Sequence, residues 1–378
     1  MKSVIVGVAA VACLAATFDA SLAQTGEKQR PTQRPAREQL REQINDNVVY
    51  VMGGQLGAAY VVIAHDVSVV VNESQTLRVL PVIGGAAVQN VRDVVFLRGI
   101  DLGVTNVLTL NALKASGELG ANLDQQIAYI TPLFPETMQV LVRPEINKIE
   151  DLRGKKVSFN SKGSGTAQFA PLVFKTLGIE VQELNMGQGD AVEKMRNGEI
   201  EATVCTCPVP IPAFPGLKAD LGFKLLPIPY TQALEENYYP AKIAPEEYPN
   251  LIAKDSGGVE TIATSSVLIS FNWPQGSIRY TRIAKFVDSM FSNFDNFRKP
   301  PRHPLWSTVN LAGTVRGWQR FPAAQEWLDK VNQADTAALR TSFNRFVATK
   351  QAAGEKDGAA GQERLFKEFL DWARTNRK

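Results

Sequence analysis

The sequence has little cysteine and almost no net charge, and each shortage excludes a class of protein. Three cysteines in 378 residues cannot form a disulfide framework, and a chain this long buries enough apolar surface to need none. The 41 Lys and Arg residues nearly balance the 38 Asp and Glu residues, which leaves a net charge of +3. Nucleic-acid binding requires clustered basic residues that displace counterions from phosphates. We therefore expect no nucleic-acid partner.

Residues 1–23 have the pattern of a secretory signal peptide. Lys2 gives a basic start, an apolar run follows from Val4 to Ala16, and small residues stand at Ser21 and Ala23. An uncleaved membrane anchor is the alternative, but the run is shorter than the roughly 18 to 20 apolar residues that a spanning helix needs. We expect cleavage after Ala23 and a soluble protein exported to the periplasm.

The rest of the chain alternates short apolar runs with helical patterns. The first unit is the apolar run Val48 to Met52, followed at once by Gly53, Gly54 and the start of a helix. Strands that alternate with helices of this kind indicate βαβ units and mostly parallel sheets. Because single cores rarely grow past about 250 to 300 residues, we expect an α/β protein of two lobes with a cleft between them.

The predicted boundaries follow the composition along the chain. A polar segment with several prolines indicates a flexible leader. A stretch rich in Ala and Gly indicates a linker to a last amphipathic helix. We expect that helix to pack on its own lobe in a monomer, and the alternatives are dimerisation or docking to a partner. The segments are the leader 24–46, the first lobe 47–137 and 262–350, the second lobe 138–261, and the C-terminal linker and helix 351–378.

The turn Gly163–Thr166 lies between a predicted strand and a predicted helix. The first turn of a helix presents free backbone N–H groups and the positive end of the macrodipole, and glycines let an anion approach closely. We expect Ser164, Gly165 and Thr166 to bind an anionic group of a ligand. The alternative is plain helix capping. A nucleotide signature is not present, because neither the P-loop pattern nor the third Rossmann glycine occurs.

Matching turns occur in the predicted first lobe at the carboxyl ends of strands. Ligands of open α/β sheets bind at that edge. The alternative is that these turns only allow the chain to reverse, as we expect for Gly84 and Gly85. The residues predicted to line a pocket here are Gly54, Tyr60, Thr105 and Asn106.

In combination, these segments resemble the TAXI family of TRAP-transporter solute receptors, within the type II periplasmic binding proteins. The resemblance covers residues 47–271 and extends more loosely beyond. The segments that carry it are Gly53-Gly54…Tyr60, Gly84-Gly85…Asn90-Val91, Asp101-Leu102-Gly103, Ile149-x-Asp151-Leu152-x-Gly154-Lys155-Lys156-Val157, Gly163-Ser164-Gly165-Thr166 and Gly198-Glu199-Ile200-Glu201-Ala202.

The resemblance implies two lobes joined by crossing strands near residues 136–143 and 260–271. It implies a small carboxylate or amino acid ligand, such as glutamate or 2-oxoglutarate, with its carboxylate on the Gly163–Thr166 turn and Gln188 touching the rest. The implied partners are the membrane permease subunits of a transporter, with no catalytic residue, metal or cofactor. Thr105-Asn106-Val107 departs from the family pattern at a place where ligand contacts are expected.

Cys205 and Cys207 flank Thr206 at the end of a predicted strand, and this segment also departs from the family pattern. The pair could bind a metal, act as a nucleophile, close a ring disulfide, or line the cleft and pack there. Zinc takes about four ligands, whereas the sequence has only two histidines and no clear base for a thiol. We expect the pair to form small polar lining of the cleft or to pack at the strand end, with Thr206 among the ligand contacts.

Two other functions compete with transport. One is a cysteine-dependent enzyme on the same scaffold, which would show rapid alkylation of Cys205 or Cys207 and turnover of a substrate. The other is a periplasmic sensor that presents its ligand to a membrane kinase. The sequence distinguishes neither from a transport receptor.

Overall fold

The computed structural model describes residues 36–55, 58–72, 76–85, 87–352 and 366. The predicted signal peptide and nearly all of the C-terminal linker and helix lie outside them. Within the described part of the chain, no helix combines the length and hydropathy needed to cross a membrane. The predicted leader was wrong at its end, because Ala36–Asp46 forms helix α1. Its Ala, Glu, Gln, Leu and Arg residues are strong helix formers, and this propensity outweighs the polarity of the segment.

One mixed β-sheet runs through the protein in the order β2-β1-β3-β10-β4-β7-β5-β6. Strands β8 and β11 pair with β4, and β9 pairs with β10. The strands are β1 Val48–Met52, β2 Arg78–Val82, β3 Leu102–Asn106, β4 Ile127–Val142, β5 Lys156–Ser158, β6 Gln182–Leu184, β7 Ala202–Cys207, β8 Lys224–Leu226, β9 Tyr239–Ile243, β10 Val259–Phe271 and β11 Gln319–Arg320.

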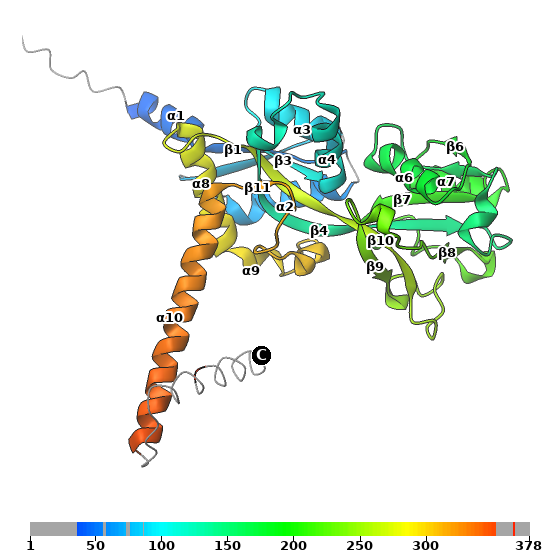
Figure 1. The fold of residues 1–378 in the computed structure, drawn as a ribbon. Helices are drawn as coiled ribbons and strands as arrows, with labels where there is room; N and C mark the ends of the chain where they lie inside the picture. The colour runs from blue at the N-terminus through cyan, green and yellow to red at the C-terminus, as the bar shows by residue number, and fades with distance from the viewer. Residues whose placement is uncertain (1–35, 56–57, 73–75, 86, 353–365, 367–378) are drawn as a thin grey trace, which may run out of the picture. The chain divides into compact units, whose positions relative to one another are not determined.

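Two parallel groups of strands lie at the ends of this order. Strand β1 pairs in parallel with β2 and β3, and β5 pairs in parallel with β6 and β7. Between these groups lie the long strands β4 and β10, which pair with each other in antiparallel orientation. Strand β4 is also antiparallel to β7, and β10 is antiparallel to β3. Figure 1 shows β4 and β10 passing from the first lobe, around β1–β3, to the second lobe, around β5–β7. The predicted two-lobed α/β fold is confirmed.

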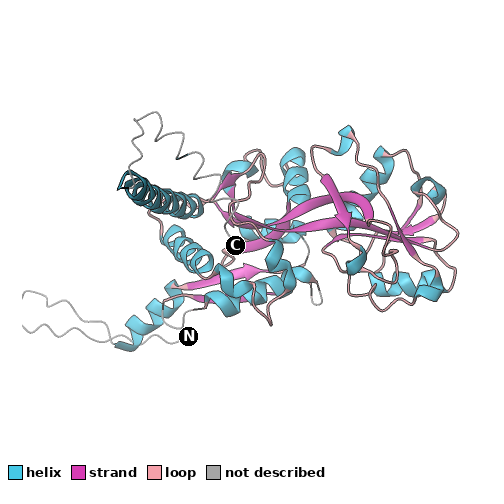
Figure 2. Cartoon of the chain, turned by 90° about the horizontal axis from the view of Figure 1, so that it is seen from below, coloured by secondary structure: helices cyan, strands magenta, loops and turns pink. Residues whose placement is uncertain are grey.

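Helices flank the strands in both lobes (Figure 2). They are α2 Ala59–Val71, α3 Ala87–Phe96, α4 Val107–Ser116, α5 Leu123–Gln126, α6 Gly165–Thr176, α7 Gln188–Arg196, α8 Ile278–Ser292, α9 Phe294–Phe297 and α10 Pro322–Ala352. Helices α2, α3, α4, α6 and α7 each follow a strand, as the alternation of strand and helix patterns in the sequence predicts.

Strand β4 contributes to all four apolar cores of the described chain. Tyr129 and Phe134 belong to the two cores of the first lobe, and Met138 and Leu141 belong to the two cores of the second. The polar residues Glu136 and Thr137 lie between these pairs and are also buried. The place where the chain passes between the lobes is therefore polar, although it is not exposed.

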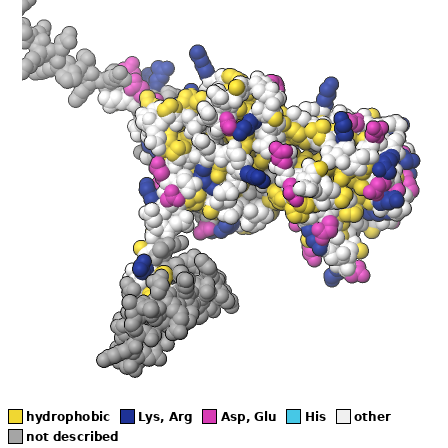
Figure 3. Space-filling model, in the orientation of Figure 1, with side chains coloured by type: hydrophobic (Ala, Val, Ile, Leu, Met, Phe, Trp, Pro, Cys, Tyr) yellow, Lys and Arg dark blue, Asp and Glu magenta, His cyan; other side chains and the backbone are white. Residues whose placement is uncertain are grey.

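Charged side chains are mixed by sign over both lobes on the face drawn in Figure 3. Lys and Arg alternate with Asp and Glu across that face, and they do not gather into a basic stripe. This distribution agrees with the small net charge of the sequence.

The turn after β1 is held against the end of β3 by a buried amide. Asn90 of α3 donates from Nδ2 to the carbonyl oxygens of Gly53 at 2.5 Å and Val104 at 2.7 Å. Gly84 packs against the same group: an added Cβ there would lie 2.5 Å from Asn90 Oδ1 and 2.6 Å from the Gly53 oxygen. Glycine at position 84 thus allows two strand-end turns to lie in contact.

We expect Gly84→Ala to destabilise the protein by about 1 to 3 kcal/mol, because a crowded core must shift to accept extra atoms. The measurement is the free energy of unfolding in urea. The control is Gly189→Ala in α7, where an added Cβ meets nothing within 4 Å; Ala there should be neutral or stabilising. Equal stability of the two variants would contradict the close packing of Gly84 against Asn90 and Gly53.

Candidate functional site

A buried carboxyl group lies where β4 passes between the lobes. Glu136 is 3% exposed. The Tyr60 hydroxyl of α2 donates a short hydrogen bond to Glu136 Oε1, and Asn106 Nδ2 donates to Glu136 Oε2 at 3.0 Å. Two residues of the first lobe therefore hold both oxygens of one acid on the crossing strand.

The orientation of Asn106 follows from its place in the chain. It ends β3 and is the N-cap of α4, where its Oδ1 accepts a hydrogen bond from Thr109 N at 2.9 Å. Because the cap uses the oxygen of the amide, the nitrogen faces Glu136. The strand-end sequence Thr105-Asn106 thus supplies a donor fixed by local structure.

Burial raises the pKa of Glu136 from 4.5 to about 7, although the hydrogen bonds from Tyr60 and Asn106 act to lower it. The pKa of the Tyr60 hydroxyl is raised well above its ordinary value by its own burial and by the nearby Glu136 charge. The acid therefore changes its charge near neutral pH, while the phenol stays protonated and donates.

The turn before α6 lies against this group from the second lobe. Ser164 is the N-cap of α6, and its Oγ accepts from Ala167 N at 3.1 Å. Thr166 Oγ1 accepts from the backbone N–H of Thr206 at 2.9 Å. An added Cβ at Gly165 would lie 3.3 Å from Asn106 Nδ2. The turn predicted to bind an anion therefore meets the first lobe at Asn106.

Several predicted site residues come together here, and others do not. Tyr60, Asn106, Gly165, Thr166 and Thr206 gather around Glu136 and the start of α6. Ser164 serves as the cap of that helix, and Gly54 lies beside Tyr60, since an added Cβ there would be 3.0 Å from Tyr60 Cβ.

Thr105 and Gln188 have structural partners away from this group. Thr105 Oγ1 donates to the Ala87 carbonyl oxygen at 3.1 Å. Gln188 ties α7 to β7: its Nε2 donates to Val204 O at 2.9 Å, and its Oε1 accepts from Thr203 Oγ1 at 3.1 Å. Thr203 pairs with Leu141, which belongs to one core of the second lobe, whereas Met138 belongs to the other core. Gln188 therefore bonds to a residue on the face of the sheet opposite Met138.

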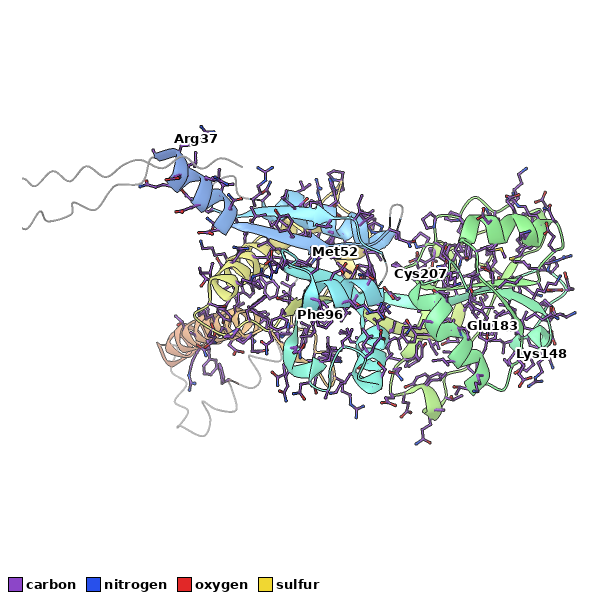
Figure 4. All side chains as sticks on the ribbon, turned by 90° about the horizontal axis from the view of Figure 1, so that it is seen from above. Arg37, Met52, Phe96, Lys148, Glu183 and Cys207 are labelled. Carbon is purple, nitrogen blue, oxygen red and sulfur yellow. A yellow bond between two sulfur atoms is a disulfide. The ribbon has the colours of Figure 1, made fainter. Side chains whose placement is uncertain are left out.

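Cys205 and Cys207 are joined by a disulfide with an S–S distance of 2.10 Å. Of the roles open to this pair, the structure shows the ring disulfide, so neither sulfur is a thiol nucleophile in this state. Figure 4 labels Cys207, and its pairing with Thr137 places it at the end of β7 beside the crossing strand. Among the described residues, no three His, Cys, Asp or Glu side chains gather as metal ligands do.

Sequence reasoning missed Glu136, the acid at the centre of this group. One signal was available, because Glu136 is the only charged residue in the sixteen residues of β4. Lone acids are rarely buried without a partner. The partners, however, come from segments 76 and 30 residues away, and no local pattern identifies them.

We expect the stability contributed by protonated Glu136 to be fully present below pH 4.5 and to be lost as the pH rises through about 7. The shift corresponds to about 3 kcal/mol, at about 1.4 kcal/mol for each pKa unit. Glu136→Gln should remove this dependence, so the variant should gain about that much relative to the parent between pH 4 and pH 8. Urea unfolding across this range measures it.

The control is Glu260→Gln on β10, because Glu260 has 69% of its side chain exposed. Its stability should follow the parent at every pH. Parallel profiles for Glu136→Gln and the parent would show that the Glu136 carboxyl titrates as it does in the unfolded chain.

Comparison with known proteins gives the family. Among solved structures, a TctC solute binding protein from Polaromonas is 14% identical over 66% of this chain and 88% of that one, with a TM-score of 0.41. The periplasmic aliphatic sulphonate binding protein SsuA from Escherichia coli is 15% identical over 88% of each chain, with a TM-score of 0.38. The periplasmic binding protein BugD is 10% identical over 87% of this chain and 97% of that one, with a TM-score of 0.46. The NMT1-like family matches residues 47–303, which is more than half of the chain, and the protein therefore belongs to the NMT1-like family.

Proposed function

We propose that this protein is the periplasmic solute-binding subunit of a membrane transporter, and that it captures a small acid between its lobes. The observation that carries the proposal is the contact of the α6 start with the first lobe, where Gly165 lies against Asn106. A ligand held at that point touches both lobes at once. Membership of the NMT1-like family supports the same reading.

The start of α6 has the chemistry to hold an acid group. Its helix of 12 residues directs the positive end of its dipole to the turn, and Ser164 satisfies only one of the first N–H groups. Glycine at position 165 leaves the backbone accessible. A carboxylate bound there would be oriented by backbone N–H groups, without a charged side chain.

Contact with both lobes provides the mechanism of capture. A ligand that binds the closed form better than the open form shifts the population toward closure, and the crossing strands β4 and β10 are the hinge. Delivery to permease subunits then needs no chemical step. The ligand is a small carboxylate or an amino acid such as glutamate or 2-oxoglutarate, and the transporter is of the TRAP type with a TAXI receptor.

The Cys205–Cys207 disulfide favours a receptor over the cysteine-dependent enzyme. A nucleophile must be a thiolate, whereas both sulfurs are bonded to each other. A disulfide also suits the oxidising periplasm that the proposed export implies.

We expect Gly165→Val to reduce affinity for the acid ligand at least 100-fold, because the new side chain fills the space beside Asn106 Nδ2, only 3.3 Å from the Cβ position. The parent is first screened by thermal shift with monocarboxylates, dicarboxylates and amino acids, since a ligand of the native state raises the melting temperature. Calorimetry then gives Kd for each variant with the best ligand.

The matched control is Gly216→Val, at a loop position where an added Cβ meets nothing within 4 Å. It should bind as the parent does. Parent-like affinity in Gly165→Val would show that the α6 turn does not hold the ligand, and no stabilisation by any acid would overturn the proposed function itself.

A further inference from the structure

Two buried hydroxyl groups flank Glu136 without a partner. Thr206 Oγ1 and Thr264 Oγ1 have no hydrogen-bond partner, and these residues are 9% and 1% exposed. Buried polar groups in folded proteins are almost always hydrogen-bonded. In the described part of the chain eight buried side-chain atoms lack a partner, and these two lie on the strands beside the buried acid, where polar groups of a ligand would satisfy them.

The strand register places these groups on one face of the sheet. Thr264 pairs with Glu136 in the β10–β4 ladder, and Thr206 pairs with Met138 in the β4–β7 ladder. Directly paired residues share a face, and so do residues two apart in one strand. Met138 belongs to the core that packs under α6, so Glu136 and both threonines face the side of the sheet on which α6 begins.

The start of α6 lies over this face of the sheet. The backbone N–H of Thr206 donates to Thr166 Oγ1 at 2.9 Å, and Asn106 Nδ2 reaches both the Gly165 Cβ position at 3.3 Å and Glu136 Oε2 at 3.0 Å. A ligand acid on the α6 turn would therefore lie close to the Glu136 carboxyl group.

When Glu136 is ionised, no cationic side chain among the described residues pairs with its charge. In the described part of the chain, the hydrogen bonds to Glu136 come from Tyr60 and Asn106, and no ion pair joins it to Lys, Arg or His. A ligand acid beside an ionised Glu136 would meet repulsion at low dielectric. A positive charge on the ligand would cancel that repulsion.

We propose that Glu136 determines the specificity of the cleft: it binds a protonated nitrogen of a ligand whose acid group lies on the start of α6. This inference rests on the proposed function and narrows its ligand to a zwitterion. An ionised carboxylate has about four acceptor positions, and Tyr60 and Asn106 occupy two of them. The remaining positions, with the hydroxyls of Thr206 and Thr264, accept the N–H groups of an ammonium.

The proposal predicts how the affinity for the ligand changes with pH. Free Glu136, with a pKa of about 7, must lose its proton to bind an ammonium, so binding releases a proton and tightens as the pH rises toward 7. Below that pH the affinity should fall by about tenfold for each unit. Within the described residues, the other titratable groups that interact electrostatically with Glu136 are Tyr60 and Tyr239. Burial raises the pKa of both hydroxyls, so they stay protonated over this pH range. An acid without an amine should show the opposite trend.

The experiment uses calorimetry on the full mature chain with matched sets of one carbon skeleton. One set is L-glutamate, 2-hydroxyglutarate and 2-oxoglutarate, and the other is L-alanine, lactate and pyruvate. In the set that binds, the amino member should bind the parent at least tenfold more tightly at pH 7.5. Glu136→Gln should reduce that preference to less than threefold, while Glu260→Gln keeps it.

The outcomes separate this inference from the proposed function. Two results would show that Glu136 does not select an ammonium, although the protein still binds acids. One is that the hydroxy or oxo acids bind as tightly as the amino acid. The other is that affinity for the amino acid falls as the pH rises from 5.5 to 7.5. If no member of either set binds and no acid of the thermal-shift panel stabilises the protein, the proposed function fails and the inference fails with it. If Glu136→Gln does not fold, the pH series on the parent alone decides.

Discussion

The buried carboxyl of Glu136 is the constraint on which the site depends. An acid that is 3% exposed must be hydrogen-bonded or neutral, because water is not there to solvate its charge. The protein uses both solutions, since Tyr60 and Asn106 donate to it while burial raises its pKa to about 7. Those two donors come from α2 and from the end of β3, so satisfying one acid fixes the arrangement of two first-lobe elements.

The same group connects the two lobes. Glu136 lies on β4 between the cores of the first and second lobes, and Asn106 lies beside the start of α6. The neighbouring strand is also anchored here, because Ser266 Oγ of β10 accepts from Phe134 N at 3.1 Å and donates to Phe134 O at 2.9 Å where the ladder shifts register. The Ser266 side chain thus takes the place of regular ladder bonds at the crossing, where the proposed function puts the hinge.

Local patterns predicted the parts of this arrangement that local sequence determines. The strand, glycine turn and helix beginning at Val48, and the capped start of α6, follow from short-range periodicity and from the conformational preferences of Gly and Ser. The meeting of Glu136 with Tyr60 depends on segments far apart in the chain, and so does its pairing with Thr264. No periodicity encodes such pairs. Helix α1 is a different case, because its strong helix formers stand in a polar segment with no buried residue, and polarity alone does not distinguish such a helix from a flexible leader.

The two unpaired hydroxyls carry a cost in the protein without a ligand. A buried polar atom left without a partner costs about 1 to 3 kcal/mol, and Val, which has nearly the shape of Thr, would remove that cost at Thr206 or Thr264. Each lies next to a group that the fold does satisfy, Thr166 in one case and Glu136 in the other. In the proposed receptor, a bound ligand would satisfy both threonines, and its binding would offset their cost. Stability of the empty protein and affinity for the ligand therefore make opposite demands on the same side chains.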